Sequence, residues 1–140
     1  MQTSTYEVLE KIGKLRRTKE KVDALRANDS YVIRVILQGV FDESVKWLLP
    51  EGDPPYTPNE LVDQEGILIN EARKILYFVE GFHDLPTVKR EQMFIELLEQ
   101  VDPKDATLLC AVKEKKLPFK GITVQHVKEA FPGMIQDGYS

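Results

Sequence analysis

The chain has 140 residues, of which 42% are hydrophobic and 30% charged, and its net charge is −4 at pH 7. This length predicts one domain over residues 1–140 with a sizeable core, and the composition is typical of a soluble globular protein. No apolar run is long enough to cross a bilayer, no secretory leader is recognisable, and a single cysteine excludes an internal disulfide. We therefore expect a cytoplasmic protein without a membrane partner.

The first half of the chain shows helical spacing of apolar residues. Leu9 and Ile12 predict a short first helix, and Thr18 is expected to cap a second. A third helix is expected over 29–40, and 45–49 are expected to be extended before a loop over 50–58. The positions expected to face inward on the second and third helices are Val22, Leu25, Ile33, Ile36, Leu37, Val40 and Phe41.

The second half is predicted to add four helices. Thr57-Pro58-Asn59-Glu60 has the threonine, proline and glutamate of a helix start, and that helix is expected to bend near Gly66. A second helix should follow Pro86, a third should run from Asp102-Pro103 through Lys115, and Thr123 should cap the last. The apolar positions that support these helices are Leu68, Ala72, Ile75, Leu76, Val79, Phe94, Leu97, Leu98, Val101, Val124, Val127 and Phe131. The predicted fold is an all-α, compact single-domain bundle of about seven helices.

Charge is distributed unevenly along the chain. Residues 11–26 carry a balance of +5 and residues 113–120 a balance of +3, whereas residues 42–71 carry −7. Two separate basic segments in an acidic chain favour contact with a polyanion through those segments, although such runs are also typical of solvated faces.

The order of motifs resembles the N-terminal DNA-binding domain of ATP-dependent DNA ligases, especially those of tailed phages. The resemblance is most specific over 102–135, where an apolar helix leads into a basic loop ending in Gly121 and the next helix stops at Phe131-Pro132-Gly133. Residues 6–13, 18–21 and 29–40 resemble the first three helices of that domain, and residues 45–50 resemble the short extended segment that follows them. Leu117-Pro118-Phe119 departs from the family, which has an acidic residue and a leucine at that step.

The resemblance implies that the two basic segments lie on one face and hold duplex DNA, intact or nicked, by its backbone. A glycine there lets backbone approach the DNA closely, and such contacts carry no sequence preference. The residues expected to bind DNA are Lys14, Arg16, Arg17, Lys19, Lys21, Lys115, Lys116, Lys120, Gly121 and Thr123.

No enzymatic activity and no cofactor are expected. The nucleotidyltransferase domain of a ligase carries its reactive lysine in a Lys-x-Asp-Gly motif, whereas Ile135 precedes Gln136-Asp137-Gly138 here. We interpret Asp137-Gly138 as a turn. The sequence therefore predicts a free-standing DNA-binding domain of a phage-type accessory protein for replication or repair, located in the host cytoplasm if it is phage-encoded.

Other chemical groups favour structural roles. His83 and His126 lack partners at zinc-ligand spacing, and Cys110 in an apolar helix is expected to be a small buried hydrophobe. Asp102 and Asp105 bracket a helix start, where capping explains carboxylates. The remaining polar, aromatic and proline-rich candidate is the loop around Trp47, Tyr56 and Pro50–Pro55, for which packing of Trp47 in the core is favoured over a partner site.

The alternative function is a protein-binding adaptor or inhibitor that retains the fold. Its partner would be a sliding clamp, a replication enzyme or a host target, and a minor virion protein is a third reading. The acidic middle of the chain and the net charge of −4 favour this alternative.

Overall fold

Seven α-helices and one 3₁₀-helix form the regular structure of residues 3–135, which are the residues described by the computed structural model. No strand occurs among them, and their β-type pairing is one isolated antiparallel bridge between Trp47 and Val79. The predicted all-α bundle is confirmed, while the expected turn at Asp137-Gly138 lies outside the described residues. The helices are α1 (Thr5–Lys14), α2 (Thr18–Ala27), α3 (Tyr31–Phe41), α4 (Ile67–Glu71), the 3₁₀-helix η1 (Ala72–Phe78), α5 (Thr87–Gln100), α6 (Pro103–Val112) and α7 (Val124–Ala130).

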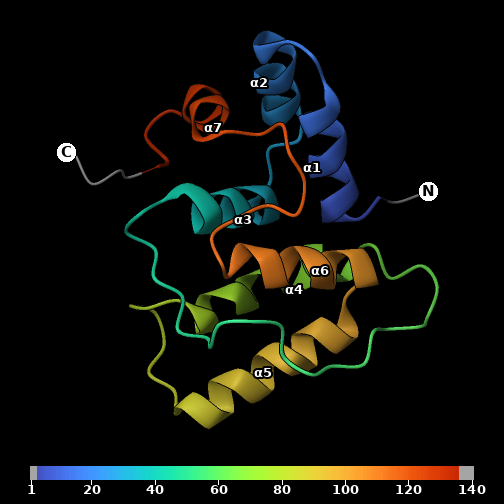
Figure 1. Ribbon diagram of the computed structural model, residues 1–140, viewed down its shortest axis with the longest axis vertical. Helices are drawn as coiled ribbons and strands as arrows, with labels where there is room; N and C mark the ends of the chain where they lie inside the picture. The colour runs from blue at the N-terminus through green and yellow to red at the C-terminus, as the bar shows by residue number, and fades with distance from the viewer. Residues whose placement is uncertain (1–2, 136–140) are drawn as a thin grey trace.

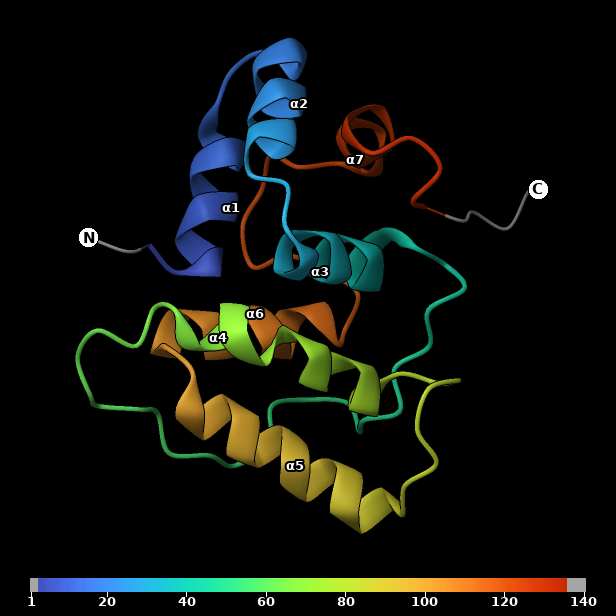
Figure 2. The same cartoon turned by 180° about the vertical axis from the view of Figure 1, so that it is seen from behind.

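The helices form two groups with α3 between them (Figure 1, Figure 2). One group contains α1, α2 and α7, and the other contains α4, η1, α5 and α6. Within and between the groups, α2 packs on α7, α5 on α6, and α1 on α6. The connection from α6 to α7 leaves the second group, passes α3 and reaches the first group. None of the helices described is long and apolar enough to span a membrane.

Helix α3 is buried because it has neighbours on both sides. Ile36 and Leu37 are fully buried, and Val32, Ile33 and Val40 are nearly so. Each fully buried aliphatic side chain contributes about 1.5–3 kcal/mol relative to exposure. The apolar spacing that predicts this helix therefore also identifies the element that joins the two groups.

The predicted extended piece is confirmed in short form. The Leu48 amide donates to the Phe78 carbonyl at 2.8 Å, and the Glu80 amide donates to the Lys46 carbonyl at 2.8 Å. Trp47 lies between them, half-buried against the core, and its indole N–H donates to the Gly39 carbonyl at 3.0 Å. Core packing of Trp47, the favoured interpretation, is confirmed.

The helix start predicted at Thr57-Pro58-Asn59-Glu60 is wrong, since helix α4 begins only at Ile67. The Asn59 side chain accepts from the Leu61 amide at 2.9 Å and donates to the Gln100 carbonyl at 2.7 Å. Such bonds between side chain and backbone offer the chain a turn in place of a helix. Leu68, Ala72, Ile75 and Val79 are buried as expected, and Leu76 is only half-buried.

Two helix ends differ from the predictions. Thr18 is the first residue of α2 rather than its cap, because the Glu20 carboxylate reaches back to the Arg17 amide at 3.1 Å. Helix α6 ends at Val112 rather than Lys115, because Lys115 adopts a left-handed φ of 60°. The Lys116 amide then donates to the Ala111 carbonyl at 3.2 Å and the Lys115 amide to the Val112 carbonyl at 2.8 Å. This pair of bonds is the Schellman ending of a helix.

The two carboxylates at the start of α6 cap two different helices. Asp102 accepts from the Lys104 amide at 2.9 Å, as expected for the cap of α6. Asp105 is fully buried, and its Oδ1 accepts from the Tyr6 amide of α1 at 2.9 Å. The Asp105 carboxylate therefore joins α1 to α6. Burial raises the pKa of this carboxyl to about 7, against a smaller lowering by the Tyr6 amide.

The α6–α7 connection touches α1 at two glycines. A Cβ on Gly121, whose φ is 110°, would overlap the carbonyl oxygen of Gly13, and a Cβ on Gly13 would lie 2.6 Å from the Lys120 carbonyl oxygen. Real Cβ atoms do not approach backbone this closely. The Lys21 ammonium of α2 donates to the Gly121 carbonyl at 2.6 Å. These contacts bring residues 120–121 against residues 13–21.

Replacement of Gly121 by alanine should destabilise the protein by about 3 kcal/mol or more, because both the backbone conformation and the Gly13 contact must change. Gly81 is the matched control, since its φ is 104° and open space surrounds it. Gly81→Ala should cost only about 1–2 kcal/mol, from the left-handed backbone alone. Urea unfolding of both variants measures the difference, and equal losses would show that the glycine contact contributes nothing.

Stability should fall between pH 5 and pH 7.5 because of Asp105. Its unfolded carboxyl releases its proton near the ordinary value of 3.8, whereas the folded one retains it until about 7. Above pH 4 the unfolded state therefore binds fewer protons, so a rise in pH favours unfolding. We expect wild type to lose about 2–3 kcal/mol over this range relative to Asp105→Asn, which does not titrate. Urea midpoints at the two pH values test this, and parallel pH dependence in both proteins would contradict it.

Candidate nucleic-acid interface

Five basic side chains stand at one end of the molecule, around the connection between α1 and α2. The guanidinium groups of Arg16 and Arg17 are exposed and have no hydrogen-bond or ion-pair partner within residues 3–135. The Lys14 ammonium lies 3.9 Å from the Glu10 carboxylate, and the Lys19 ammonium lies 2.9 Å from the Asp23 carboxylate. These exposed surface pairs are weak. We call this surface the basic tip, formed by Lys14, Arg16, Arg17, Lys19 and Lys120.

The structure brings the two predicted segments together at the tip only in part. Lys120 and Gly121 meet the end of α1 through the glycine contact. The Lys21 ammonium points inward to Gly121 and is half-buried, so it holds the connection in place. Gly121, expected to permit close approach to DNA, is required here by the close approach of Gly13.

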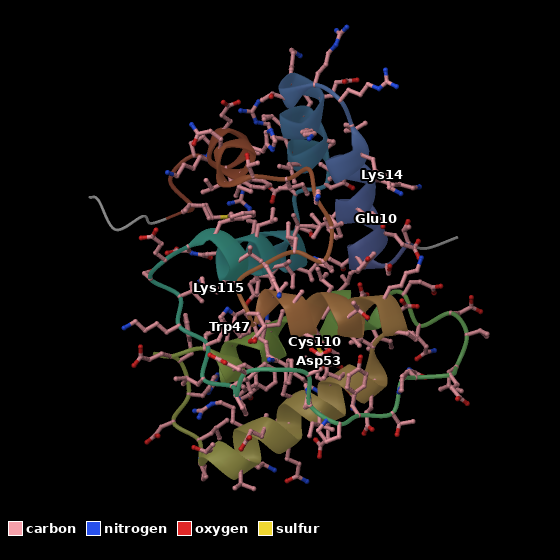
Figure 3. The ribbon with its side chains drawn as sticks, viewed as in Figure 1. Glu10, Lys14, Trp47, Asp53, Cys110 and Lys115 are labelled. Atoms are coloured by element: carbon pink, nitrogen blue, oxygen red, sulfur yellow. The ribbon has the colours of Figure 1, made fainter. Side chains whose placement is uncertain are left out.

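Lys115 and Lys116 lie elsewhere. The Lys115 ammonium donates to the carbonyls of Asp42 at 2.7 Å and Val45 at 2.9 Å, where α3 ends and the extended piece begins. Burial lowers the pKa of Lys115 from its ordinary value, against the nearby charges of Asp42 and Glu43. Figure 3 shows Lys115 beside α3 and Trp47, away from Lys14 at the end of α1. Lys116 follows it and is exposed. The two lysines are thus separate from the basic tip.

The side chain of His126 caps the start of helix α7. Thr123 is the residue before the helix, as predicted, and its amide donates to Nδ1 of His126 at 3.0 Å. Burial, followed by the positive charge of Lys21, lowers the pKa of His126. The neutral ring that accepts this bond is therefore favoured. The bond occupies the Thr123 amide, and the exposed Thr123 hydroxyl lies 3.3 Å from the same His126 Nδ1, so the amide and the hydroxyl both face the ring.

Sequence reasoning missed one basic residue of this end. Lys11 is exposed and lies three residues before Lys14 on α1, so the two side chains share a face. The three-residue spacing between Lys11 and Lys14 in the sequence is enough to identify Lys11 as part of this surface. Arg26, in contrast, is used internally, because its guanidinium donates to the Glu129 carbonyl at 2.8 Å and to the Ala130 carbonyl at 3.4 Å at the end of α7.

Charge is segregated between the two ends of the fold. Residues 5–28 and 119–131, which hold α1, α2 and α7, contain nine Lys or Arg and five Asp or Glu, a balance of +4. The rest of the chain therefore carries −8.

No group of three or more His, Cys, Asp or Glu side chains within residues 3–135 is arranged to hold a metal ion. His83, exposed in its loop, stacks on Tyr77 with ring centroids 4.1 Å apart.

The fold and this surface define a small all-helical protein in which the end formed by α1, α2 and α7 carries a net positive charge and the rest a net negative one. Residues 8–118 match the family described as "Family of unknown function (DUF6433)", and the chain belongs to that family. The matched range begins within α1 and runs through α6, and Lys120 and α7 lie beyond it. No curated protein and no solved structure matches the chain.

Lys115 and Lys116 should respond differently to substitution. Lys115→Met removes an ammonium that satisfies two carbonyls, and we expect a loss of about 2 kcal/mol of stability. Lys116→Met changes the neighbouring exposed charge and should stay within about 0.5 kcal/mol of wild type. Urea unfolding compares the two variants, and an unchanged midpoint for Lys115→Met would refute its anchoring role.

Proposed function

We propose that the protein binds duplex DNA, intact or nicked, through the phosphate backbone and without sequence preference. The basic tip carries the proposal, since Arg16 and Arg17 present two guanidinium groups free of internal partners at the end of the fold with a balance of +4. Guanidinium groups suit bidentate contact with phosphate. The resemblance to phage ligase DNA-binding domains assigns the protein an accessory role in replication or repair.

The charge of the remaining chain supports a defined orientation on DNA. The −8 carried outside α1, α2 and α7 repels a polyanion, while the tip attracts it. Such a protein approaches DNA with α1 and α2 first. The net charge of −4 is therefore compatible with binding through one end of the molecule.

The proposal includes no chemical step. The thiol of Cys110 is buried, and burial, with a smaller effect of Asp53, raises its pKa to about 11, so it remains protonated at neutral pH. A thiol in this state is a poor nucleophile. We propose that the protein binds DNA without catalysing a reaction on it.

Binding should weaken steeply with salt. Contact with about three to five phosphates gives a slope of log K against log salt of roughly −3 to −4.5 on duplex DNA. Arg16→Ala/Arg17→Ala/Lys120→Ala should flatten this slope by about 2 to 3 and weaken binding equally on unrelated sequences. Fluorescence anisotropy with labelled intact and nicked duplexes measures both effects.

The matched control removes three exposed positive charges from the other end of the fold. Lys46→Ala/Arg73→Ala/Lys89→Ala has the same change in net charge, and its three side chains have no recorded partner within residues 3–135. It should retain the wild-type slope. An equal loss in this control, or no binding of wild type at low salt, would refute the basic tip as a DNA surface.

A protein-binding adaptor is the second candidate function, and one observation favours it. Leu61 and Val62 are 71% and 80% exposed in the connection before α4, although both are apolar. Bonds from Asn59 to Gln100 and from Gln64 to the Val62 carbonyl hold this connection in shape. An apolar pair presented by an ordered acidic loop is typical of a contact with another protein. Failure of DNA binding at low salt would make this candidate the leading one.

A further inference from the structure

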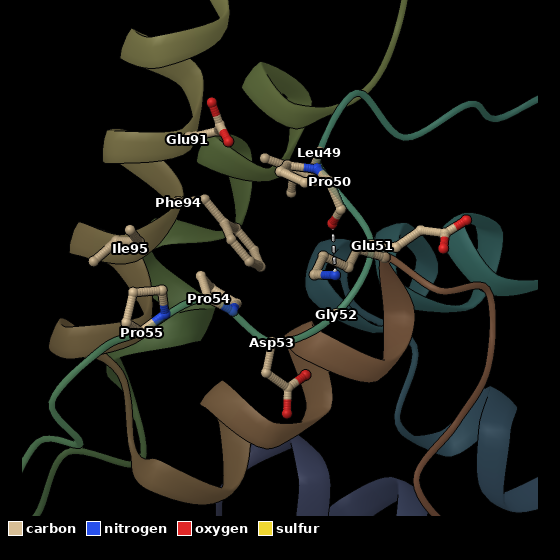
Figure 4. A pocket seen from close by; sticks show the side chains of 11 residues that line it. Leu49, Pro50, Glu51, Gly52, Asp53, Pro54, Pro55, Glu91, Phe94 and Ile95 are labelled. Carbon is tan, nitrogen blue, oxygen red and sulfur yellow. Dashed lines mark hydrogen bonds between the residues drawn. The ribbon is translucent and has the colours of Figure 1, made fainter.

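A pocket of about 180 Å³ lies in the half of the molecule that carries the net negative charge. It is lined in part by α5, which lies at the opposite end of the molecule from the connection between α1 and α2 (Figure 1). The segment after the Trp47 bridge, residues 49–55, forms one wall and α5 forms the other (Figure 4). Its lining includes Pro54, Phe94, Ile95, Glu51, Asp53 and Glu91.

The interior of the pocket is apolar and preformed. Figure 4 shows the Phe94 ring between α5 and the 49–55 segment, with Ile95 and Pro54 beside it. Phe94 is 2% exposed and belongs to the core, where its ring meets Phe78 edge-on at 5.1 Å between centroids. Prolines fix the backbone of the opposite wall. A side chain entering this space meets surfaces that require little ordering on binding.

The rim of the pocket is acidic and lacks neutralising partners. Glu51, Asp53 and Glu91 form no ion pair within residues 3–135, and in Figure 4 the carboxylates of Glu51 and Glu91 point away from the apolar centre, while that of Asp53 points toward α6. The one positive side chain among the lining residues, Lys113, is 1% exposed. Its ammonium donates to the Pro50 carbonyl at 3.0 Å and pairs with Glu114 at 3.2 Å. No cation within residues 3–135 neutralises the three rim carboxylates, although Asp53 also faces the Cys110 thiol.

We propose that this pocket binds a short basic segment of a partner protein. One aliphatic side chain of the segment enters between Phe94 and Pro54, and lysine or arginine side chains on either side of it pair with Glu51, Asp53 and Glu91. The size of the pocket favours a single side chain, because sites for whole small molecules are roughly 300–1,000 Å³. The outward direction of the Glu51 and Glu91 carboxylates places the cations beside the anchor rather than within the pocket.

This site is independent of the proposed DNA surface. It shares no residue with the basic tip, and its charge repels DNA. Loss of DNA binding therefore leaves the peptide proposal intact, and the reverse also holds. A protein with both sites would hold a basic partner while its other end contacts DNA.

The test uses a fluorescein-labelled peptide, Lys-Arg-Leu-Lys-Arg, and a second peptide with serine in place of leucine. At low salt the leucine peptide should bind wild type, and the serine peptide should bind about tenfold more weakly. Glu51→Gln/Asp53→Asn/Glu91→Gln should weaken the leucine peptide by at least about tenfold. When the leucine peptide is added to the wild-type protein, the largest amide chemical-shift changes should occur at Gly52 and Ile95. This measurement does not depend on whether the variant folds.

Glu60→Gln/Asp63→Asn/Glu80→Gln is the matched control, with the same change in net charge at exposed positions outside the pocket. It should bind the leucine peptide as wild type does. Equal affinity for both peptides, an equal loss in the control, or shifts away from Gly52 and Ile95 would overturn the proposal. Concentration-dependent self-association of wild type that the pocket variant abolishes would assign the site to a second copy and overturn it too.

Discussion

The contact between Gly13 and Gly121 is the constraint on which the α1, α2 and α7 end of the molecule depends. Two backbone segments 108 positions apart meet there without side chains between them, and Lys21 donates to the same Gly121 carbonyl. Because α7 reaches α2 only through this crossing, the packing of α2 on α7 follows from it. The same crossing places the Lys120 backbone against Gly13, the residue before Lys14, and thereby adds Lys120 to the basic tip.

The separation of charge is a consequence of the chain path. The acidic residues 42–71 come after α3 and lead into the second group, whereas the basic residues of α1 and α2 come before α3. Helix α3, buried between both groups, keeps the two populations apart. The net charge of −4 is the sum of two opposite surfaces, each suited to a different kind of partner. The DNA proposal concerns one of these surfaces, and the peptide proposal concerns the other.

Sequence patterns predict the fold well where burial decides the structure and poorly where polar side chains decide it. The apolar spacing of α3 and α5 identifies most of their buried residues because one side of each helix must leave water. It misses Val32 and Arg90, which are buried, and Phe41, predicted to face inward, is only half-buried. The helix start at Thr57 is wrong because Asn59 binds Leu61 and Gln100, partners that spacing does not reveal. Lys115 is assigned to DNA by its charge, yet its ammonium satisfies the Asp42 and Val45 carbonyls, which only tertiary structure brings within reach.

We propose that residues from α1, α2 and the α6–α7 connection form one DNA-contacting surface. Amide NMR of the uniformly ¹⁵N-labelled protein, titrated with a short duplex at low salt, tests it most directly. We expect the largest chemical-shift changes to fall on residues 14–19 and 120–123 together, with residues 43–55 unaffected. Changes confined to one of the two segments, or centred on residues 43–55, would contradict it.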